Sequence, residues 1–112
     1  MKGKILFVCT ANLQRSPTAE ELFMNWQGKW ETKSAGTDPV PGRTPITQEL
    51  VNWADLIICM EPEHIEFIKS YFNCPAGKLK VLNVEDRYFR NDPELVAELQ
   101  RRVPQILASY FE

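Results

Sequence analysis

The sequence of 112 residues has little of what metal sites and disulfide frameworks need. It holds one histidine and three cysteines, and no two cysteines are spaced as a C-x-x-C pair. An odd number of cysteines without an export signal argues against a disulfide framework, and a single histidine argues against a structural zinc site. We therefore expect no metal and no cofactor, and a reducing cytoplasm as the default compartment.

Long apolar runs and a strong net charge are absent too. No run approaches the roughly 20 residues that span a bilayer, and the run behind the basic first residues is too short for a signal peptide. The formal net charge of -2 gives no support to nucleic-acid or anionic-membrane binding. An apolar content of 44% is typical of a folded chain, and the length predicts one domain over residues 1–112.

Short apolar runs alternate with segments of helical periodicity. The predicted strands are residues 4–9, 30–34, 55–60 and 79–84. The predicted helices are residues 17–27, 46–53, 61–72 and 92–110. A strict alternation of strands and helices predicts a parallel sheet with helices on both faces.

Capping residues and prolines predict where the helices begin and end. Ser16 is a good N-cap for the first helix, with Pro17 in its first turn, and Gly28 would end it. Pro104 lies inside the last helical segment and should kink or split that helix near Val103.

Residues 9–16, C-T-A-N-L-Q-R-S, lie between a predicted strand and a predicted helix start, and we call them the Cys9 loop. A helix N-terminus attracts anions, because its first amides lack intrahelical partners and its dipole is positive there. The same field favours the thiolate form of Cys9. Arg15 adds a planar set of donors suited to phosphate. The loop therefore predicts a nucleophilic thiol beneath an oxyanion, with the loop amides pointing inward.

Other side chains support this interpretation. Ser16 can donate a hydrogen bond to Cys9 and hold the thiolate, and Asn12 tolerates the left-handed backbone that such a loop needs. Cys9 and Met60 are the last residues of two predicted strands, and the pair Glu85-Asp86 directly follows a third. Because ligands of parallel sheets bind at the carboxyl ends of strands, we expect these residues to meet in one crevice.

These residues match a known family. V-C-T-A-N-L-Q-R-S-P-T-A-E resembles the active-site loop of the low-molecular-weight protein tyrosine phosphatases. Residues 34–37 (S-A-G-T), 54–61 and 86–89 resemble further segments of that family, in the same order. The resemblance covers most of the chain. It implies a flavodoxin-like, three-layer α/β/α sandwich with a four-stranded parallel sheet of strand order 2-1-3-4.

The chain departs from the usual family pattern in four places. Ala11 stands where glycine is usual, Gln14 where a second cysteine is common, and Arg87 where the acid loop has proline. The region between Thr37 and Ala54 is shorter than usual. In relatives the second cysteine can form a protective disulfide with the nucleophile, so the resemblance implies a more oxidation-sensitive nucleophile here.

The resemblance also implies two-step catalysis. Cys9 attacks phosphorus and forms a phosphocysteine, Arg15 holds the phosphoryl oxygens, and an aspartic acid protonates the leaving oxygen and then activates water. Asp86 is predicted as this acid, because it follows the last strand and aligns with the acid loop. The residues predicted to bind phosphate are Thr10, Ala11, Asn12, Leu13, Gln14, Arg15 and Ser16.

Several residues near this site allow more than one interpretation. Asp92 is the rival acid, although a helix N-cap before a first-turn proline also explains it, and Glu85 is a third candidate. Tyr88 and Phe89 are either core anchors or an aromatic wall for a flat substrate ring. His64 lies among helix-face acids, and we expect it to be solvated rather than catalytic.

The sequence thus predicts a metal-free phosphomonoester hydrolase, monomeric or weakly dimeric, that acts on phosphotyrosine proteins or small aryl or alkyl phosphates. One alternative is thiol-dependent arsenate reduction, which needs resolving thiols near Cys9. Cys59 is expected in the core, Cys74 in a turn, and Glu66 occupies another plausible position for such a thiol. A further alternative is a catalytically weak phosphate-binding regulatory module.

Overall fold

The computed structural model describes residues 3–110, and of residue 110 only the backbone. Its strands are β1 (Gly3–Cys9), β2 (Trp30–Gly36), β3 (Leu56–Cys59) and β4 (Leu79–Val81). Its α-helices are α1 (Arg15–Phe23), α2 (Gln48–Trp53), α3 (Pro62–Tyr71) and α4 (Pro93–Tyr110). Two short 3-10 helices, η1 (Trp26–Gly28) and η2 (Ala76–Lys78), precede β2 and β4. None of the helices in the described part of the chain is long and apolar enough to cross a membrane.

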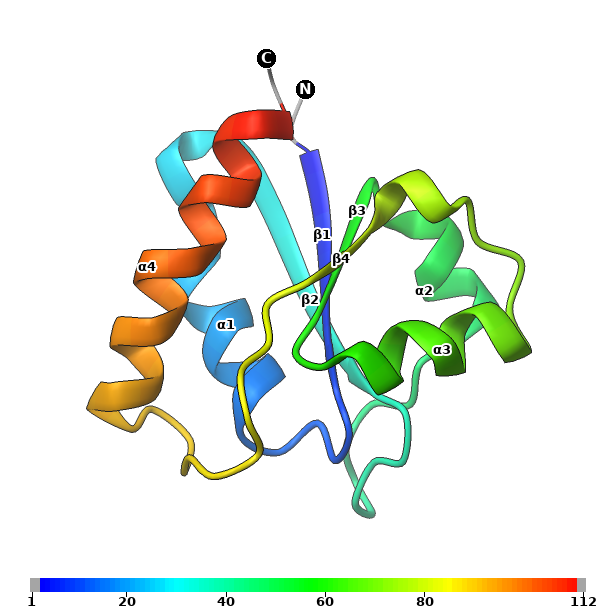
Figure 1. The fold of residues 1–112 in the computed structure, drawn as a ribbon, viewed down its shortest axis with the longest axis horizontal. Coiled ribbons are helices and arrows are strands. Elements are labelled where there is room, and N and C mark those ends of the chain that lie inside the picture. Colours follow the sequence, from blue (N-terminus) through cyan, green and yellow to red (C-terminus); the bar gives the residue numbers. More distant parts are fainter. Residues whose placement is uncertain (1–2, 111–112) are drawn as a thin grey trace.

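The four strands form one parallel sheet in the order β2-β1-β3-β4. Helices α1 and α4 cover one face of the sheet, and α2 and α3 cover the other (Figure 1). The three-layer α/β/α sandwich and the strand order 2-1-3-4 are thus confirmed. Because β1 is central, both faces of it are buried, which explains its nearly unbroken apolar sequence.

The alternation of side chains along the central strands separates two cores. Ile5, Phe7 and Cys9 point to the face that α1 and α4 cover. Cys59, on the neighbouring strand, points to the opposite face, among side chains of α2 and α3. The nucleophile predicted from the sequence and this second buried thiol therefore lie on opposite faces of the sheet.

The start and the end of the first helix differ from the prediction. The helix begins at Arg15, with Gln14 in the N-cap position, so Ser16 lies within the first turn and is not the cap. The helix ends at Phe23 rather than near residue 27, because Met24 leaves the helical conformation (ψ 123°) and Asn25 after it is left-handed (φ 56°). Gly28 consequently ends η1 and not the long helix that we expected.

Other boundaries also shift. β2 continues to Gly36, beyond the predicted end at residue 34, and α2 begins at Gln48, with the Thr47 side chain accepting from the Leu50 amide. β4 has three residues, although the amides of Leu82 and Val84 still donate to the carbonyls of Cys59 in β3 and of Met60 directly after it. Pro104 does not split the last helix.

Candidate active site

The Cys9 loop lies at the carboxyl edge of the sheet (Figure 1). Cys9 is the last residue of β1 and pairs with Gly36 of β2, and α1 begins six residues later at Arg15. The segments that follow β3 and β4 reach the same edge and bring Glu61 and Asp86 beside Arg15. The expected convergence of strand ends is therefore present.

Residues 36–44, which we call the backing segment, hold the Cys9 loop from outside. The carbonyls of Cys9, Thr10 and Ala11 accept hydrogen bonds from the amides of residues 37, 38 and 40 at 3.0, 2.9 and 3.2 Å. The Asn12 carbonyl accepts from Arg43 Nε at 2.7 Å. Because the N–H of a trans peptide points opposite to its C=O, the amides of residues 10–13 face away from the backing segment. Amides that face inward in this way are what an anion-binding nest requires.

Asn12 fixes the shape of the loop. Its backbone is left-handed (φ 54°), as expected for an asparagine at this place. Its side-chain amide nitrogen donates to Ser16 Oγ and Ser34 Oγ, both at 3.0 Å, and its oxygen accepts from the Thr44 amide at 3.0 Å. The buried Asn12 side chain thus ties together the loop, the first turn of α1, β2 and the backing segment.

The Cys9 thiol and the Ser16 hydroxyl are 2.9 Å apart, and both side chains are buried. The other acceptor near the hydroxyl, the Ala35 carbonyl, is 3.5 Å away. Since Ser16 Oγ already accepts from Asn12, its own proton is free to point to the sulfur. This contact between Ser16 and Cys9 is the one that the sequence predicts.

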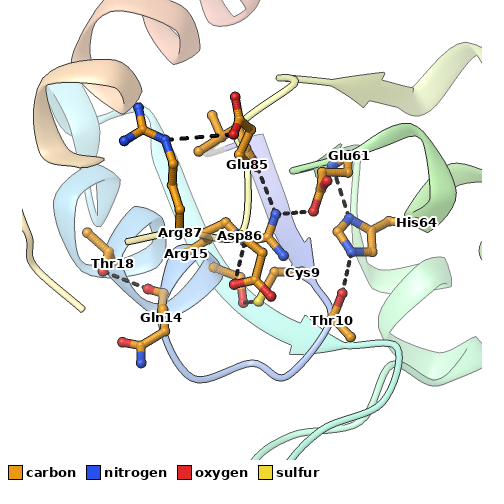
Figure 2. Close-up of polar contacts among 12 residues, drawn as sticks. Cys9, Thr10, Gln14, Arg15, Thr18, Glu61, His64, Glu85, Asp86 and Arg87 are labelled. Atoms are coloured by element: carbon orange, nitrogen blue, oxygen red, sulfur yellow. Dashed lines mark hydrogen bonds and ion pairs between the residues drawn. The ribbon is translucent and has the colours of Figure 1, made fainter. Parts of the chain in front are cut away.

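The Arg15 guanidinium is held beside the loop with only 2% of its side chain exposed. It donates to the Val84 carbonyl at 2.7 Å and forms an ion pair with Glu61. Asp86 Oδ1 lies 3.9 Å from Arg15 Nε (Figure 2). Glu61 orients the cation and was not identified from the sequence, because its partner lies 46 positions away.

His64 is buried, so the expectation of a solvated side chain is wrong. Its Nδ1 accepts from the Glu61 amide at 3.0 Å, and its Nε2 lies 2.9 Å from Thr10 Oγ1 (Figure 2). The pKa of His64 is lowered to about 4, mainly because the ring is buried and secondly because the Arg15 cation is near. The one signal in the sequence was the spacing, because a polar side chain at the third helical position often returns to the N-cap amide.

The three candidate acids have different surroundings. Asp86 is 68% exposed and lies near Arg15. Asp92 accepts from the Glu94 amide at 2.9 Å and caps α4, as its structural interpretation predicts. The Glu85 carboxylate is 3.8 Å from Arg87 Nε. Of the three, Asp86 is the one found beside the guanidinium that would hold phosphate.

The two aromatic residues that follow Asp86 differ in how far they are buried. Tyr88 is 8% exposed and packs into the core beside α4, with the Arg87 guanidinium 4.5 Å from the centre of its ring. Phe89 is 77% exposed. The core interpretation therefore holds for Tyr88, and only Phe89 is free to contact a substrate.

The other thiols are not placed to assist Cys9. Cys59 is fully buried on the opposite face of the sheet, and burial, with neighbouring Cys74, raises its pKa to about 12. Cys74 packs against the same core and also has a raised pKa because of burial. The core prediction for Cys59 is confirmed.

Within residues 3–110, one group of possible metal ligands comes together, formed by Glu61, Glu63 and His64. Both ring nitrogens of His64 already take part in hydrogen bonds, and the Glu61 carboxylate faces Arg15. These contacts explain the cluster without a metal ion.

A cysteine at the end of a parallel strand, followed by a loop and an arginine at a helix start, is the arrangement expected of a cysteine-based phosphatase. Residues 4–45 match the family model for low molecular weight phosphotyrosine protein phosphatase. A protein-arginine-phosphatase of Bacillus subtilis (strain 168) is 31% identical over 103 residues, with 70% of this chain and 69% of the relative covered. The low molecular weight protein-tyrosine-phosphatase Wzb of Escherichia coli (strain K12) is 31% identical over 88 residues, with 59% and 60% covered.

Solved structures agree with this fold. A crystal structure of a YwlE mutant from Bacillus subtilis has a TM-score of 0.82 at 24% identity and covers 99% of this chain and 100% of that one. Wzb from Escherichia coli K30 in complex with phosphate has a TM-score of 0.69 at 25% identity, with 90% and 93% covered. The chain belongs to the low molecular weight phosphotyrosine protein phosphatase family and is a cysteine-based phosphatase.

Proposed function

We propose that the protein hydrolyses aryl phosphomonoesters through a phosphocysteine on Cys9, with Arg15 binding the phosphoryl group and Asp86 as general acid and base. The observation that carries this proposal is the Cys9 thiol 2.9 Å from Ser16, at the base of a loop whose carbonyls at residues 9–12 are turned outward to the backing segment. The loop amides and Arg15 together supply the donors that a phosphate dianion needs.

The steps follow from this arrangement. The Cys9 thiolate attacks phosphorus, the bond from phosphorus to the ester oxygen breaks, and the Asp86 carboxyl gives its proton to the departing oxygen. A water then attacks phosphorus while the Asp86 carboxylate takes its proton, and the bond from sulfur to phosphorus breaks. Inorganic phosphate leaves, and the thiolate and the protonated acid return.

The surface around the loop favours an aryl group on the substrate. Leu13, Val40 and Phe89 are large apolar side chains that are 39%, 37% and 77% exposed. Leu13 belongs to the Cys9 loop, Val40 donates its amide to that loop, and Phe89 follows Asp86 by three positions. An apolar rim around a phosphate site suits a phosphotyrosine ring, which is flat and apolar.

An assay with an aryl phosphate in the presence of a chelator tests the reaction. We expect wild-type protein to hydrolyse p-nitrophenyl phosphate without metal, and Cys9→Ser to be inactive yet folded. Cys74→Ser is the matched control and should keep full activity. Well-folded wild type that binds phosphate without turnover would overturn the proposal in favour of a phosphate-binding module.

Substrate choice requires a comparison of peptides, because one relative is named for phosphoarginine and another for phosphotyrosine. We expect a higher kcat/KM for a phosphotyrosine peptide than for the same peptide carrying phosphoarginine. Phe89→Ala should reduce that preference mainly through KM. A preference for phosphoarginine would contradict the substrate class and leave the Cys9 chemistry standing.

The acid is tested by two isosteric variants. Asp86→Asn should lower kcat about 10²–10⁴-fold, the usual range for loss of a general acid. Asp92→Asn should leave kcat nearly unchanged, because that carboxylate caps α4. If Asp92→Asn lowers kcat and Asp86→Asn does not, the assignment of the acid is wrong.

Arsenate reduction is not favoured by this structure. That reaction needs a second thiol that can reach the nucleophile, and Cys59 and Cys74 both belong to the core on the opposite face of the sheet from Cys9.

A further inference from the structure

His64 connects the start of α3 with the first loop residue after the nucleophile. The imidazole is 1% exposed, and both of its nitrogens have partners from different segments. Nδ1 meets the backbone amide of Glu61 at 3.0 Å, and Nε2 meets the hydroxyl of Thr10 at 2.9 Å (Figure 2). The ring therefore bridges the segment after β3 and the Cys9 loop.

The hydrogen bond at Nδ1 determines the tautomer of the ring. A backbone N–H can only donate, so Nδ1 must offer a lone pair to Glu61. The single proton of the neutral imidazole then lies on Nε2, and Nε2–H donates to the oxygen of Thr10. The Thr10 hydroxyl thus receives a hydrogen bond and keeps its own proton for another acceptor.

The charged groups around His64 are Arg15, Glu61, Glu63 and Asp86. Burial and the Arg15 cation disfavour the imidazolium and outweigh the opposite effect of Glu61 and Asp86, so the pKa of His64 falls to about 4. His64 consequently stays neutral at neutral pH, and Nε2 remains a donor while a substrate anion binds.

We propose that His64 is a positioning residue of the phosphatase reaction, which fixes the Thr10 hydroxyl so that this hydroxyl donates its proton to an oxyanion in the Cys9 loop. This proposal rests on the phosphate site of the proposed function. The start of α3 then holds both ends of the loop, because Glu61 holds Arg15 while His64 holds Thr10.

The tautomer is measured directly by long-range ¹H–¹⁵N NMR on protein without a histidine tag. His64 is the only histidine of the sequence, so the spectrum contains one imidazole. We expect the pattern of a ring protonated at Nε2 and bare at Nδ1, unchanged from pH 8 to pH 5.5. A ring protonated at Nδ1, or one that titrates near pH 6.5, would overturn the proposal.

Variants test whether the bridge acts on the anion. His64→Asn keeps an acceptor within reach of the Glu61 amide but is too short to reach Thr10, and Thr10→Val removes the hydroxyl at nearly constant shape. Each should raise the dissociation constant of inorganic phosphate about 3–10-fold, as for one lost hydrogen bond. Thr10→Ser, which restores a hydroxyl, should stay close to wild type.

The double variant His64→Asn/Thr10→Val should be no worse than Thr10→Val alone, because the two residues act through one hydroxyl. Two outcomes would overturn the proposal: additive losses of phosphate affinity in the double variant, or a loss in His64→Asn while Thr10→Val binds phosphate normally. Either would show that His64 acts through the start of α3 and not through the Thr10 hydroxyl. Phosphate binding and NMR need no turnover, so an inactive wild type with an Nε2–H ring would refute the proposed function and not this bridge.

Discussion

Gly36 shows how closely the backing segment approaches the Cys9 loop. A Cβ atom at this position would lie 2.5 Å from the Thr10 carbonyl oxygen and 3.0 Å from the Asn12 amide nitrogen. Both neighbours are backbone atoms, so neither can rotate away. We expect Gly36→Ala to lower the free energy of unfolding by about 1–3 kcal/mol, as overpacking usually does, and to weaken phosphate binding.

The measurement for Gly36→Ala is urea unfolding together with phosphate titration. Gly77→Ala is the matched control, because a Cβ there meets nothing within 4 Å. Equal stability and equal phosphate affinity in the two variants would show that the loop moves aside without cost.

The titration of His64 should make the free energy of unfolding depend on pH. In the unfolded chain the pKa is near 6.5, and in the folded protein it is about 4. Between these values the unfolded state binds the proton and the folded state does not, so the free energy of unfolding falls as the pH falls from 6.5 to 4. The loss is about 3 kcal/mol at most.

Wild type and His64→Asn are compared by denaturant unfolding at pH 7, 6, 5 and 4. The wild-type stability should decline more steeply below pH 6.5, since the carboxylates are common to both proteins. Parallel curves would mean that His64 titrates equally in the folded and unfolded states.

At the scale of single residues, the sequence identified side chains whose partners are near in the chain. Cys9, Asn12 and Ser16 are within seven positions of one another, so their contacts follow from the loop itself. His64 was placed in solvent, because its sequence neighbours are acids and its partner Thr10 is 54 positions away. Only the fold brings such distant residues together.

Among the elements, α4 shows that packing can outweigh local propensity. Pro104 has no N–H to donate to the carbonyl of Gln100, yet the helix continues because Val103 and Leu107 on either side are buried. Pro104→Ala should restore one hydrogen bond and raise the free energy of unfolding by about 2 kcal/mol. The value of kcat should not change, because the pocket that Pro104 lines lies beside Trp26 and not beside the Cys9 loop.

The matched control is Pro93→Ala. Pro93 is the first residue of α4, where a proline replaces an amide that would have no helical partner. Urea unfolding should therefore show no gain for this variant. An equal gain from both alanines would indicate an effect on the unfolded chain and not on the helix.

Strands were easier to predict than helix ends, for a physical reason. Burial on both faces of the sheet makes strands such as β1 and β3 continuously apolar. The start of α1 was misplaced because Ser16 looks like a cap, whereas its hydroxyl is used by Cys9 and Asn12.

For the whole molecule, the parallel sheet decides which thiols can meet. Cys9 and Cys59 lie on adjacent strands, but the register pairs Cys59 with Val8 and sends the two sulfurs to opposite faces. From the sequence alone, Cys59 could still act as a resolving thiol for Cys9. The face of the sheet to which each side chain points depends on the pairing of β1 with β3, which the sequence does not give.

Oxidation tests this separation. Peroxide should convert Cys9 to sulfinic acid without a disulfide to Cys59 or Cys74, so that thiol does not restore the activity lost. The Cys59→Ala/Cys74→Ser variant should lose activity at the wild-type rate, and saturating phosphate should slow the loss by covering the sulfur. Peptide mass spectrometry identifies the products. An intramolecular disulfide of Cys9 with either cysteine would contradict the separation of the thiols. Complete recovery with thiol after prolonged exposure would contradict the expected sulfinic acid.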